Sequence, residues 1–183
     1  IERVDQRLQE VLEPTPPIQR QQSLPGCGPI LSAVVVLELG DVGRFPDAEH
    51  VAAYAGVVPR VHASGGKTRH GSARPDVNHY LKWAFVEAAN AATVHADRHP
   101  QRHVSSLYRR LRAVKGHSKA IGAVARHLAE ATYWVHTRNQ TYRDPGLDRV
   151  RKAAARGCHA PRERRCECDR PSEQIHAPAR AKR

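Results

Sequence analysis

Ser64 is the side chain of this sequence best placed to act as a nucleophile, because it stands in a short stretch rich in glycine and basic residues. Gly65 and Gly66 follow it directly, and two residues without side chains let another backbone approach closely. The cations around the serine are Arg60, Lys67 and Arg69. Positive charge there can stabilise the charge that builds up on phosphoryl oxygens when a phosphodiester is attacked.

A serine hydroxyl must also lose its proton, and His62 and His70 are near enough in the sequence to be considered as bases. Their position in the sequence does not show that either ring is aimed at Ser64. Two interpretations therefore stay open: a serine that attacks phosphodiesters, or a flexible basic loop that grips a phosphate without cutting it. Under both, the residues expected to bind nucleic acid here are Arg60, Gly65, Gly66, Lys67 and Arg69.

A second candidate contact with phosphate is the hexapeptide Leu24-Pro25-Gly26-Cys27-Gly28-Pro29. Gly26 and Gly28 predict a tight turn, and Pro29 is suited to the first position of the helix that follows. The first N–H groups of that helix have no partners within it and lie at the positive end of its dipole, which suits a phosphate. The pattern is similar to the hairpin of a helix-hairpin-helix DNA-binding motif. A plain turn into a helix is the alternative.

The charge of the chain favours a polyanionic partner. Lys and Arg number 30 against 18 Asp and Glu, which gives a net charge of +12 over 183 residues. Nucleic acid is therefore the first partner to consider, with a solvated basic surface as the alternative. No apolar run approaches the roughly 20 residues of a membrane span, and no signal peptide is visible. We expect a cytoplasmic protein with no membrane partner.

The residue types that bind metals or form disulfides are poorly arranged for either purpose. The four cysteines are Cys27, Cys158, Cys166 and Cys168. Their spacing fits neither a disulfide framework nor a usual zinc finger. The carboxylates are scattered along the chain and form no cluster able to hold a divalent cation. We therefore expect no metal site within this chain.

Helical spacing of the apolar residues predicts a mainly α fold. Helices are expected over 18–23, 29–40, 47–56, 78–99, 105–114 and 119–137. Gly40 and Gly56 are natural helix ends, and Asp47 is a natural N-cap. Residues 57–76 lack helical periodicity and predict a loop or a short β-hairpin. The few large aromatic residues available to anchor a core are Trp83, Phe85, Tyr108 and Trp134.

The composition divides the chain into three segments. Residues 1–17 are interpreted as the end of an upstream, coiled-coil-like helix and a proline-rich linker. Residues 18–144 form the helical domain, and residues 145–183 are rich in Arg, Ala and Pro and are expected to form a disordered basic tail. The chain contains no methionine and opens within a helical pattern. We therefore expect it to be a piece of a longer protein.

Six sequence blocks between Ser23 and Tyr142 occur in a specific order. They are Leu24-Pro25-Gly26-Cys27-Gly28-Pro29, Glu38-Leu39-Gly40-Asp41, Arg44-Phe45-Pro46, Tyr54-Ala55-Gly56-Val57-Val58-Pro59, Ser64-Gly65-Gly66-Lys67 and Asn78-His79-Tyr80-Leu81-Lys82-Trp83-Ala84. In this order and spacing, the chain resembles the C-terminal domain of the IS110/IS1111 family of insertion-sequence transposases. Val77 is a departure, because the family commonly has a glycine before this asparagine, and it predicts an altered turn.

The resemblance implies a function that the residues alone do not establish. Members of the family join an RNase H-like domain, whose acidic residues bind divalent metal, to a helical domain that carries a serine. They recombine DNA under the guidance of a structured bridge RNA, and the serine taken as the nucleophile corresponds to Ser64. For this chain the resemblance implies DNA and a guide RNA as partners, Mg²⁺ bound in an upstream domain, a homo-oligomer and a place at the bacterial nucleoid.

Three functions remain in competition. The first is the DNA-binding, catalytic-serine domain of a transposase that cuts and rejoins DNA, inactive as a fragment. The second is a helix-hairpin-helix module that binds nucleic acid without chemistry, or an inactive transposase remnant. The third is an interaction domain whose leading helix pairs with another chain. Only the first requires the hydroxyl of Ser64.

Overall fold

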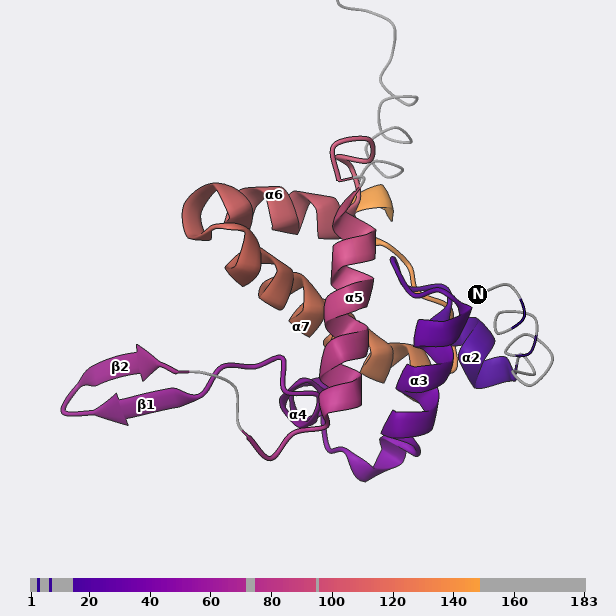
Figure 1. The fold of residues 1–183 in the computed structure, drawn as a ribbon, viewed down its shortest axis with the longest axis horizontal. Helices are drawn as coiled ribbons and strands as arrows, with labels where there is room; N and C mark the ends of the chain where they lie inside the picture. Colours follow the sequence, from indigo (N-terminus) through magenta and orange to yellow (C-terminus); the bar gives the residue numbers. More distant parts are fainter. Residues whose placement is uncertain (1–2, 4–6, 8–14, 72–74, 95, 149–183) are drawn as a thin grey trace, which may run out of the picture.

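The computed structural model describes residues 3, 7, 15–71, 75–94 and 96–148, and within them the fold is mainly helical (Figure 1). The helices are α2 (Pro16–Gln21), α3 (Pro29–Leu39), α4 (Ala48–Tyr54), α5 (His79–Val94), α6 (His103–Lys115) and α7 (His117–Thr137), with a 3-10 turn η1 (Val42–Arg44) after α3. Strands β1 (Val61–Ser64) and β2 (Lys67–His70) pair as an antiparallel hairpin between α4 and α5. The predicted mainly α fold is confirmed, and 57–76 contains a hairpin.

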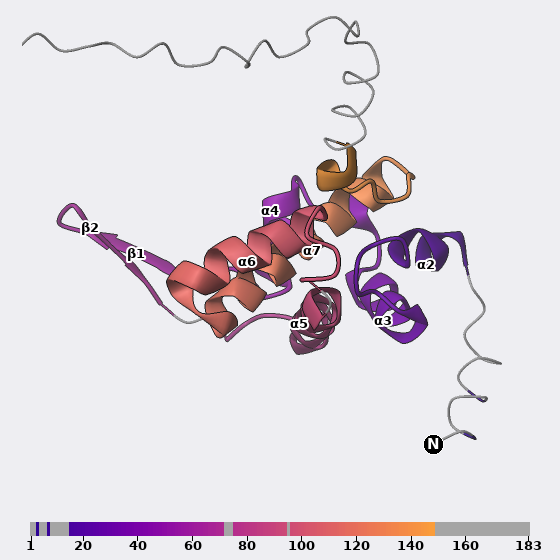
Figure 2. The same ribbon diagram turned by 90° about the horizontal axis from the view of Figure 1, so that it is seen from above.

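Helix α7 lies at the centre of the helical body, and α4, α5 and α6 all pack against it (Figures 1 and 2). Its buried side chains are mostly small: Ala120, Ile121, Val124, Ala125, Leu128, Ala129, Thr132 and Val135. Because interhelical distance depends on the side chains at the contact, alanines allow the neighbouring helices to approach closely. Of the four expected aromatic anchors, Phe85 and Tyr108 are buried. Trp83 and Trp134 are instead 49% and 47% exposed, so the expectation that they anchor the core is wrong.

Three of the predicted helix boundaries are confirmed by their caps. Gly40 ends α3 with a φ of +61°. The Asp47 carboxylate accepts a hydrogen bond from the backbone N–H of His50 and begins α4. Asn78 begins α5, because its side-chain oxygen accepts hydrogen bonds from the N–H groups of Tyr80 and Leu81, both at 3.0 Å. Each cap satisfies backbone groups that a helix end leaves without a partner.

Helices α2 and α3 lie side by side and are joined by a turn that contains both candidate glycines. α2 begins at Pro16, two residues before the predicted start, because proline is well tolerated in the first turn of a helix. Gly28 is the N-cap of α3 and Pro29 its first residue, as predicted. The arrangement is helix, turn, helix. Its assignment as a helix-hairpin-helix motif stays a prediction.

The Val77 position, where the sequence departs from the resembled family, is explained by packing. Gly56 has a φ of +69°, and a Cβ placed there would lie 2.6 Å from a Val77 methyl carbon. The valine side chain therefore fills the space above the glycine, and the turn still delivers Asn78 to its capping position.

The described residues extend slightly beyond the expected start of the tail. Residues 145–148 form one helical turn. Asp144 Oδ1 accepts hydrogen bonds from the N–H groups of His103 (2.9 Å) and Gly146 (2.8 Å), which fixes this turn to the start of α6. The remainder of the expected tail, 149–183, and most of the expected upstream segment, 1–14, lie outside the described residues.

Candidate nucleic-acid interface

The β1–β2 hairpin extends away from the helical body and carries Ser64 at its tip (Figure 1). Gly65 and Gly66 form the two-residue turn with φ values of +57° and +74°. Positive φ at both central residues is the requirement of the type I′ hairpin turn, which glycine meets at least cost. All of β1 is exposed, including Val61 at 58%. The turn therefore presents the Ser64 hydroxyl to solvent, as predicted.

The strand register divides the candidate residues between the two faces of the hairpin. Ser64 pairs with Lys67, and His62 pairs with Arg69. Directly paired residues lie on the same face of a two-stranded sheet, and alternate residues of a strand share a face. Ser64, His62, Lys67 and Arg69 therefore share one face. His70 pairs with Val61, and this backbone register assigns position 70 to the opposite face of the hairpin from position 64.

His62, the other candidate base, is turned away from Ser64. The His62 ring lies against Gly71 at the root of the hairpin, with Cδ2 and Nε2 both 3.6 Å from the point where a Cβ of Gly71 would stand. Among the described residues, no hydrogen bond involves the Ser64 hydroxyl. The described side chains of the hairpin thus supply an exposed hydroxyl with cations beside it, and none of them is an oriented general base.

The root of the hairpin is tied to α4 and α5 by backbone hydrogen bonds at both ends. The Val57 N–H donates to the Ala52 carbonyl (3.2 Å), and the Asn78 N–H donates to the Tyr54 carbonyl (3.1 Å). The Gly71 N–H donates to the Arg60 carbonyl (2.8 Å) and extends the ladder beyond β1 and β2. These bonds hold the outgoing and returning chains together at the surface of the helical body.

A cluster of side chains from separate sequence blocks surrounds this root. Asn78 Nδ2 donates to Glu38 Oε2 at 2.8 Å, which joins α5 to α3. The Arg44 guanidinium carbon lies 4.6 Å from the Phe45 ring centroid and 4.8 Å from that of Tyr54. Hydrogen bonds with Asn78 and Arg44 lower the pKa of the Tyr54 hydroxyl below its usual value. Sequence reasoning identified Asn78 as a helix start but did not predict this cluster, because the Asn78–Glu38 contact spans 40 positions.

A cavity of about 720 Å³ lies where the hairpin joins α4, with His50, Arg60 and His62 in its lining. His50 Nδ1 is 2.8 Å from Asp47 Oδ1. This hydrogen bond holds the pKa of the Asp47 carboxyl below its usual value and fixes the orientation of the His50 ring. His50 was not predicted as a site residue. The only sequence signal for it is its position three residues after an N-cap aspartate.

The two glycines of the α2–α3 turn have different surroundings. Gly26 has a φ of +81°, and a Cβ there would lie 2.0 Å from the Ala88 carbonyl oxygen of α5. Gly28 is exposed and has nothing within 4 Å of its Cβ position. The intervening Cys27 is buried, and burial raises the pKa of its thiol to about 12. Gly26 therefore serves helix packing, whereas Gly28 is free to approach another molecule.

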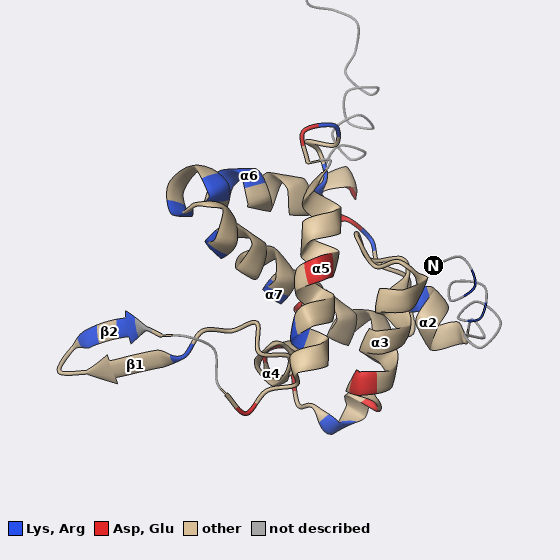
Figure 3. Ribbon diagram, in the orientation of Figure 1, with Lys and Arg blue, Asp and Glu red and all other residues tan. Residues whose placement is uncertain are grey.

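Positive charge gathers on the side of the molecule that carries the hairpin. In Figure 3 the blue segments include the hairpin and α6, which extend to the same side in both views of the fold. The exposed cations of α6 are Arg109, Arg110, Arg112 and Lys115, and this helix has no acidic residue. This charge distribution suits a polyanion lying across the hairpin and α6.

Two further properties bear on the class of function. In the part of the chain that the structure describes, no group of three or more His, Cys, Asp or Glu is placed to hold a metal ion. No helix within the described ranges combines the length and apolarity needed to cross a bilayer. Cys158, Cys166 and Cys168 lie outside the described residues.

Residues 19–105 match the family model "Transposase IS116/IS110/IS902 family". The matched range runs from α2 through the hairpin and α5, and it includes Ser64. The family resemblance expected from the six sequence blocks is confirmed at this level. The role of Ser64 stays a prediction.

Several known proteins are similar to the chain. A "Probable family 20 transposase" of Pseudomonas aeruginosa is 32% identical over 91 residues, covering 50% of this chain and 27% of that protein. The transposase for insertion sequence element IS1111A of Coxiella burnetii is 29% identical over 142 residues, covering 76% of this chain and 38% of that protein. The insertion element IS116 uncharacterized 44.8 kDa protein of Streptomyces clavuligerus is 35% identical over 71 residues, which are 39% of this chain and 18% of that protein. The matches thus cover less than two fifths of each of these relatives.

Proposed function

We propose that this chain is the serine-bearing, DNA-binding part of a transposase of the IS116/IS110/IS902 family. The observation that carries the proposal is the position of Ser64. It lies at the exposed tip of a projecting hairpin, on the same face as Lys67 and Arg69, within the segment that matches the family. A nucleophile that must reach a phosphodiester within a duplex needs this kind of accessible, cation-flanked position.

In the proposed reaction, the Ser64 Oγ attacks a backbone phosphorus of DNA. An Oγ–P bond forms while one P–O ester bond of the strand breaks, and the serine proton passes to a general base. The oxygen that leaves takes up a proton, and the reverse sequence with a different strand end rejoins the DNA. Lys67 and Arg69 stabilise the charge on the non-bridging phosphoryl oxygens.

The general base is proposed to come from outside the hairpin. His62 lies against Gly71, and position 70 is on the opposite face. Mg²⁺, which the family resemblance implies, does not fit the described residues of this chain, since they bring no set of carboxylates together. No step of the proposed reaction is therefore assigned to a metal here.

The binding part of the proposal extends beyond Ser64. Arg60, Lys67 and Arg69 on the hairpin and the open backbone at Gly28 contact the DNA backbone, and the cations of α6 continue the same surface. The proposal also includes three features implied by the family resemblance: a structured guide RNA, a homo-oligomer and a location at the nucleoid.

A non-catalytic binding arm is the second candidate function. The observation that favours it is the absence of a hydrogen-bonded base at the Ser64 hydroxyl among the described residues. A two-stranded hairpin with both faces exposed also gains little stability from its own contacts. Such an arm would become ordered against the nucleic acid that it grips.

Strand transfer by the transposase that carries this chain separates the two candidates. Ser64→Ala should abolish recombination while leaving DNA affinity within about twofold, because one exposed hydroxyl contributes little to binding. Ser118→Ala, which removes another exposed serine hydroxyl, is the matched control and should recombine normally. Full recombination by Ser64→Ala would exclude the catalytic role and leave the non-catalytic binding arm as the remaining candidate function.

A further inference from the structure

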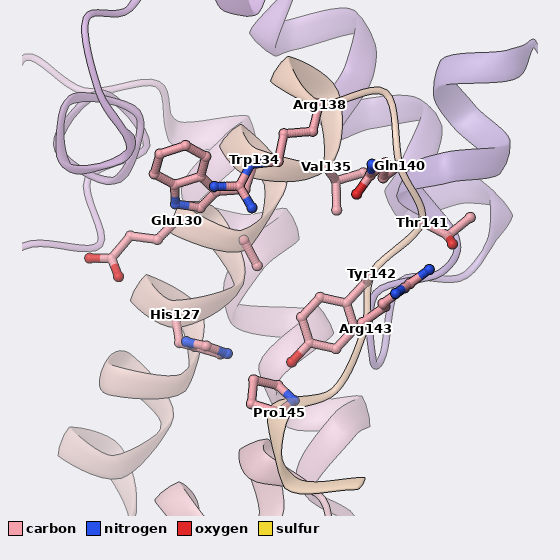
Figure 4. A pocket seen from close by; sticks show the side chains of 11 residues that line it. His127, Glu130, Trp134, Val135, Arg138, Gln140, Thr141, Tyr142, Arg143 and Pro145 are labelled. Carbon is pink, nitrogen blue, oxygen red and sulfur yellow. The ribbon is translucent and has the colours of Figure 1, made fainter. Parts of the chain in front are cut away.

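Residues 138–146, here called the strap, turn back along α7 and are held at two points. The Tyr142 N–H donates to Ser23 Oγ at 2.7 Å, which fixes the strap to the α2–α3 turn. Asp144 Oδ1 accepts from the His103 N–H at 2.9 Å, which fixes it to the start of α6. Between the strap and α7 lies a cavity of about 420 Å³ (Figure 4). That volume is within the range of small-molecule pockets, about 300–1,000 Å³.

Two polar atoms of this cavity's lining are buried without a hydrogen-bond partner. They are His127 Nε2, from α7, and the Tyr142 hydroxyl, from the strap. Figure 4 shows the two rings pointing toward one another across the space between α7 and the strap. Buried polar atoms are nearly always paired in folded proteins. Their position favours a polar ligand that supplies the missing partners.

The other end of the cavity offers a flat, cationic surface. Trp134 is 47% exposed, and the Arg138 guanidinium lies over its indole with 4.5 Å between the guanidinium carbon and the ring centroid. Arg143 adds a second exposed cation from the strap. The carboxylate of Glu130 is paired with Arg126 Nε at 2.6 Å, so it does not cancel these charges.

We propose that this cavity binds one unpaired nucleotide of a single-stranded nucleic acid. The base stacks on the Trp134–Arg138 pair and its phosphate lies near Arg143. Its polar edge reaches His127 Nε2 and the Tyr142 hydroxyl by displacing the side chains that close these two atoms to solvent. Stacking on aromatic or guanidinium planes with hydrogen bonds to the base edge is the usual way in which proteins hold a splayed-out base. A base within a duplex cannot enter, because both of its faces are already stacked.

The choice of a nucleotide as the ligand rests on the proposed function, whereas the site itself is separate from it. The cavity is built from α7 and the strap, and none of its lining residues belongs to the Ser64 hairpin. Loss of Ser64 chemistry and loss of nucleotide binding can therefore be measured independently.

Fluorescence of Trp134 provides the test. Trp83→Phe in the full chain leaves Trp134 as the only tryptophan. Single-stranded DNA and RNA oligonucleotides of about ten residues should quench this fluorescence at moderate salt, and a duplex of the same sequence should not. If only the DNA or only the RNA oligonucleotide quenches the fluorescence, that result identifies the chemistry of the natural ligand and supports the site. Adenosine 5′-monophosphate should compete, and ribose 5-phosphate should compete at least tenfold less well.

Two variants locate the binding. In the same background, Tyr142→Phe and His127→Phe should each weaken quenching about tenfold without lowering the melting temperature, because each replaces an unpaired buried polar atom with an apolar one. The matched control is Tyr133→Phe, whose hydroxyl donates to the Pro46 carbonyl outside the cavity, and Ser64→Ala should also bind normally. The proposal would be overturned if the duplex quenched as strongly as the single strands, or if neither the DNA nor the RNA oligonucleotide quenched. Unchanged affinity in both variants would also overturn it.

Discussion

Gly26 and Gly28 belong to one motif but differ in backbone conformation and in the space around them. Gly26 combines a φ of +81° with the α5 backbone at its Cβ position, whereas Gly28 has ordinary φ and open space. The sequence expectation assigned both glycines to phosphate contact. Only contacts with Ala88, 62 positions away, reveal that Gly26 is required for helix packing.

Alanine substitution should therefore separate the two glycines. We expect Gly26→Ala to lower the free energy of unfolding by at least about 2 kcal/mol, through backbone strain and collision with Ala88. Gly28→Ala should cost less than about 1 kcal/mol and should affect DNA affinity more than stability. Urea denaturation of both variants measures the difference. Equal stability of the two would contradict the packing role of Gly26.

Asn78 joins a helix cap to the root of the hairpin. Asn78→Ala removes the acceptor for two N–H groups and the donor to Glu38, and we expect it to lower stability by about 1–2 kcal/mol. Asn78→Ser keeps a capping oxygen and should recover most of that stability. Thermal denaturation of the pair checks this, and a serine variant as unstable as the alanine variant would show that capping is not the cause.

At the scale of elements, the sequence predicted what local chemistry decides. Gly40, Asp47 and Asn78 marked helix ends correctly because each cap acts on its own helix. The start of α6 was placed at Ser105, two residues too late, because the acceptor at the start of this helix is Asp144, 41 positions away. The register that separates position 70 from Ser64, and the cavity under the strap, likewise depend on pairings that no local pattern encodes.

The hairpin should contribute to nucleic-acid affinity mainly through charge. We expect Lys67→Gln with Arg69→Gln to reduce the slope of log affinity against log salt by up to about 2 for duplex DNA, at roughly 0.9 for each phosphate that is no longer neutralised. The fold should be unaffected, because both side chains are exposed. The matched control neutralises Arg98 and Arg102, away from the hairpin. Filter binding across salt concentrations gives the slopes. Equal slopes for the hairpin variant and the unmodified chain would show that the hairpin does not contact the DNA backbone.

Helix α7 should make the fold sensitive to mild acid. Burial lowers the pKa of His127 and of His136 below the usual 6.5, aided by the charges of His103 and Arg20 respectively. The unfolded chain therefore takes up protons below about pH 6.5 that the folded chain excludes, so stability is full above that pH and falls as pH drops below it. Melting temperature measured from about pH 8 to about pH 5 should show this decline. His127→Phe should flatten it, while His79→Gln, an exposed control, should not.

At the scale of the whole molecule, charge and shape place two separate surfaces on one helical body. The hairpin and α6 form a cationic side that suits a duplex backbone, while the strap and α7 enclose a cavity that suits an unpaired nucleotide. Composition predicted a polyanionic partner from the net charge of +12. It did not predict the two surfaces that we propose as binding sites, because these depend on how distant segments pack around α7.

The most direct test of the central claim is identification of the residue that becomes covalently attached to DNA. The proposed transposase that contains this chain is incubated with DNA, quenched during the proposed strand transfer and digested with nuclease and trypsin. Trypsin cuts after Arg60 and Lys67, so Ser64 is the only serine of the peptide 61–67. We predict that this peptide carries a nucleotide by mass spectrometry and that the adduct disappears in Ser64→Ala. An adduct on another peptide, or one that persists in Ser64→Ala, would contradict the assignment of Ser64 as the nucleophile.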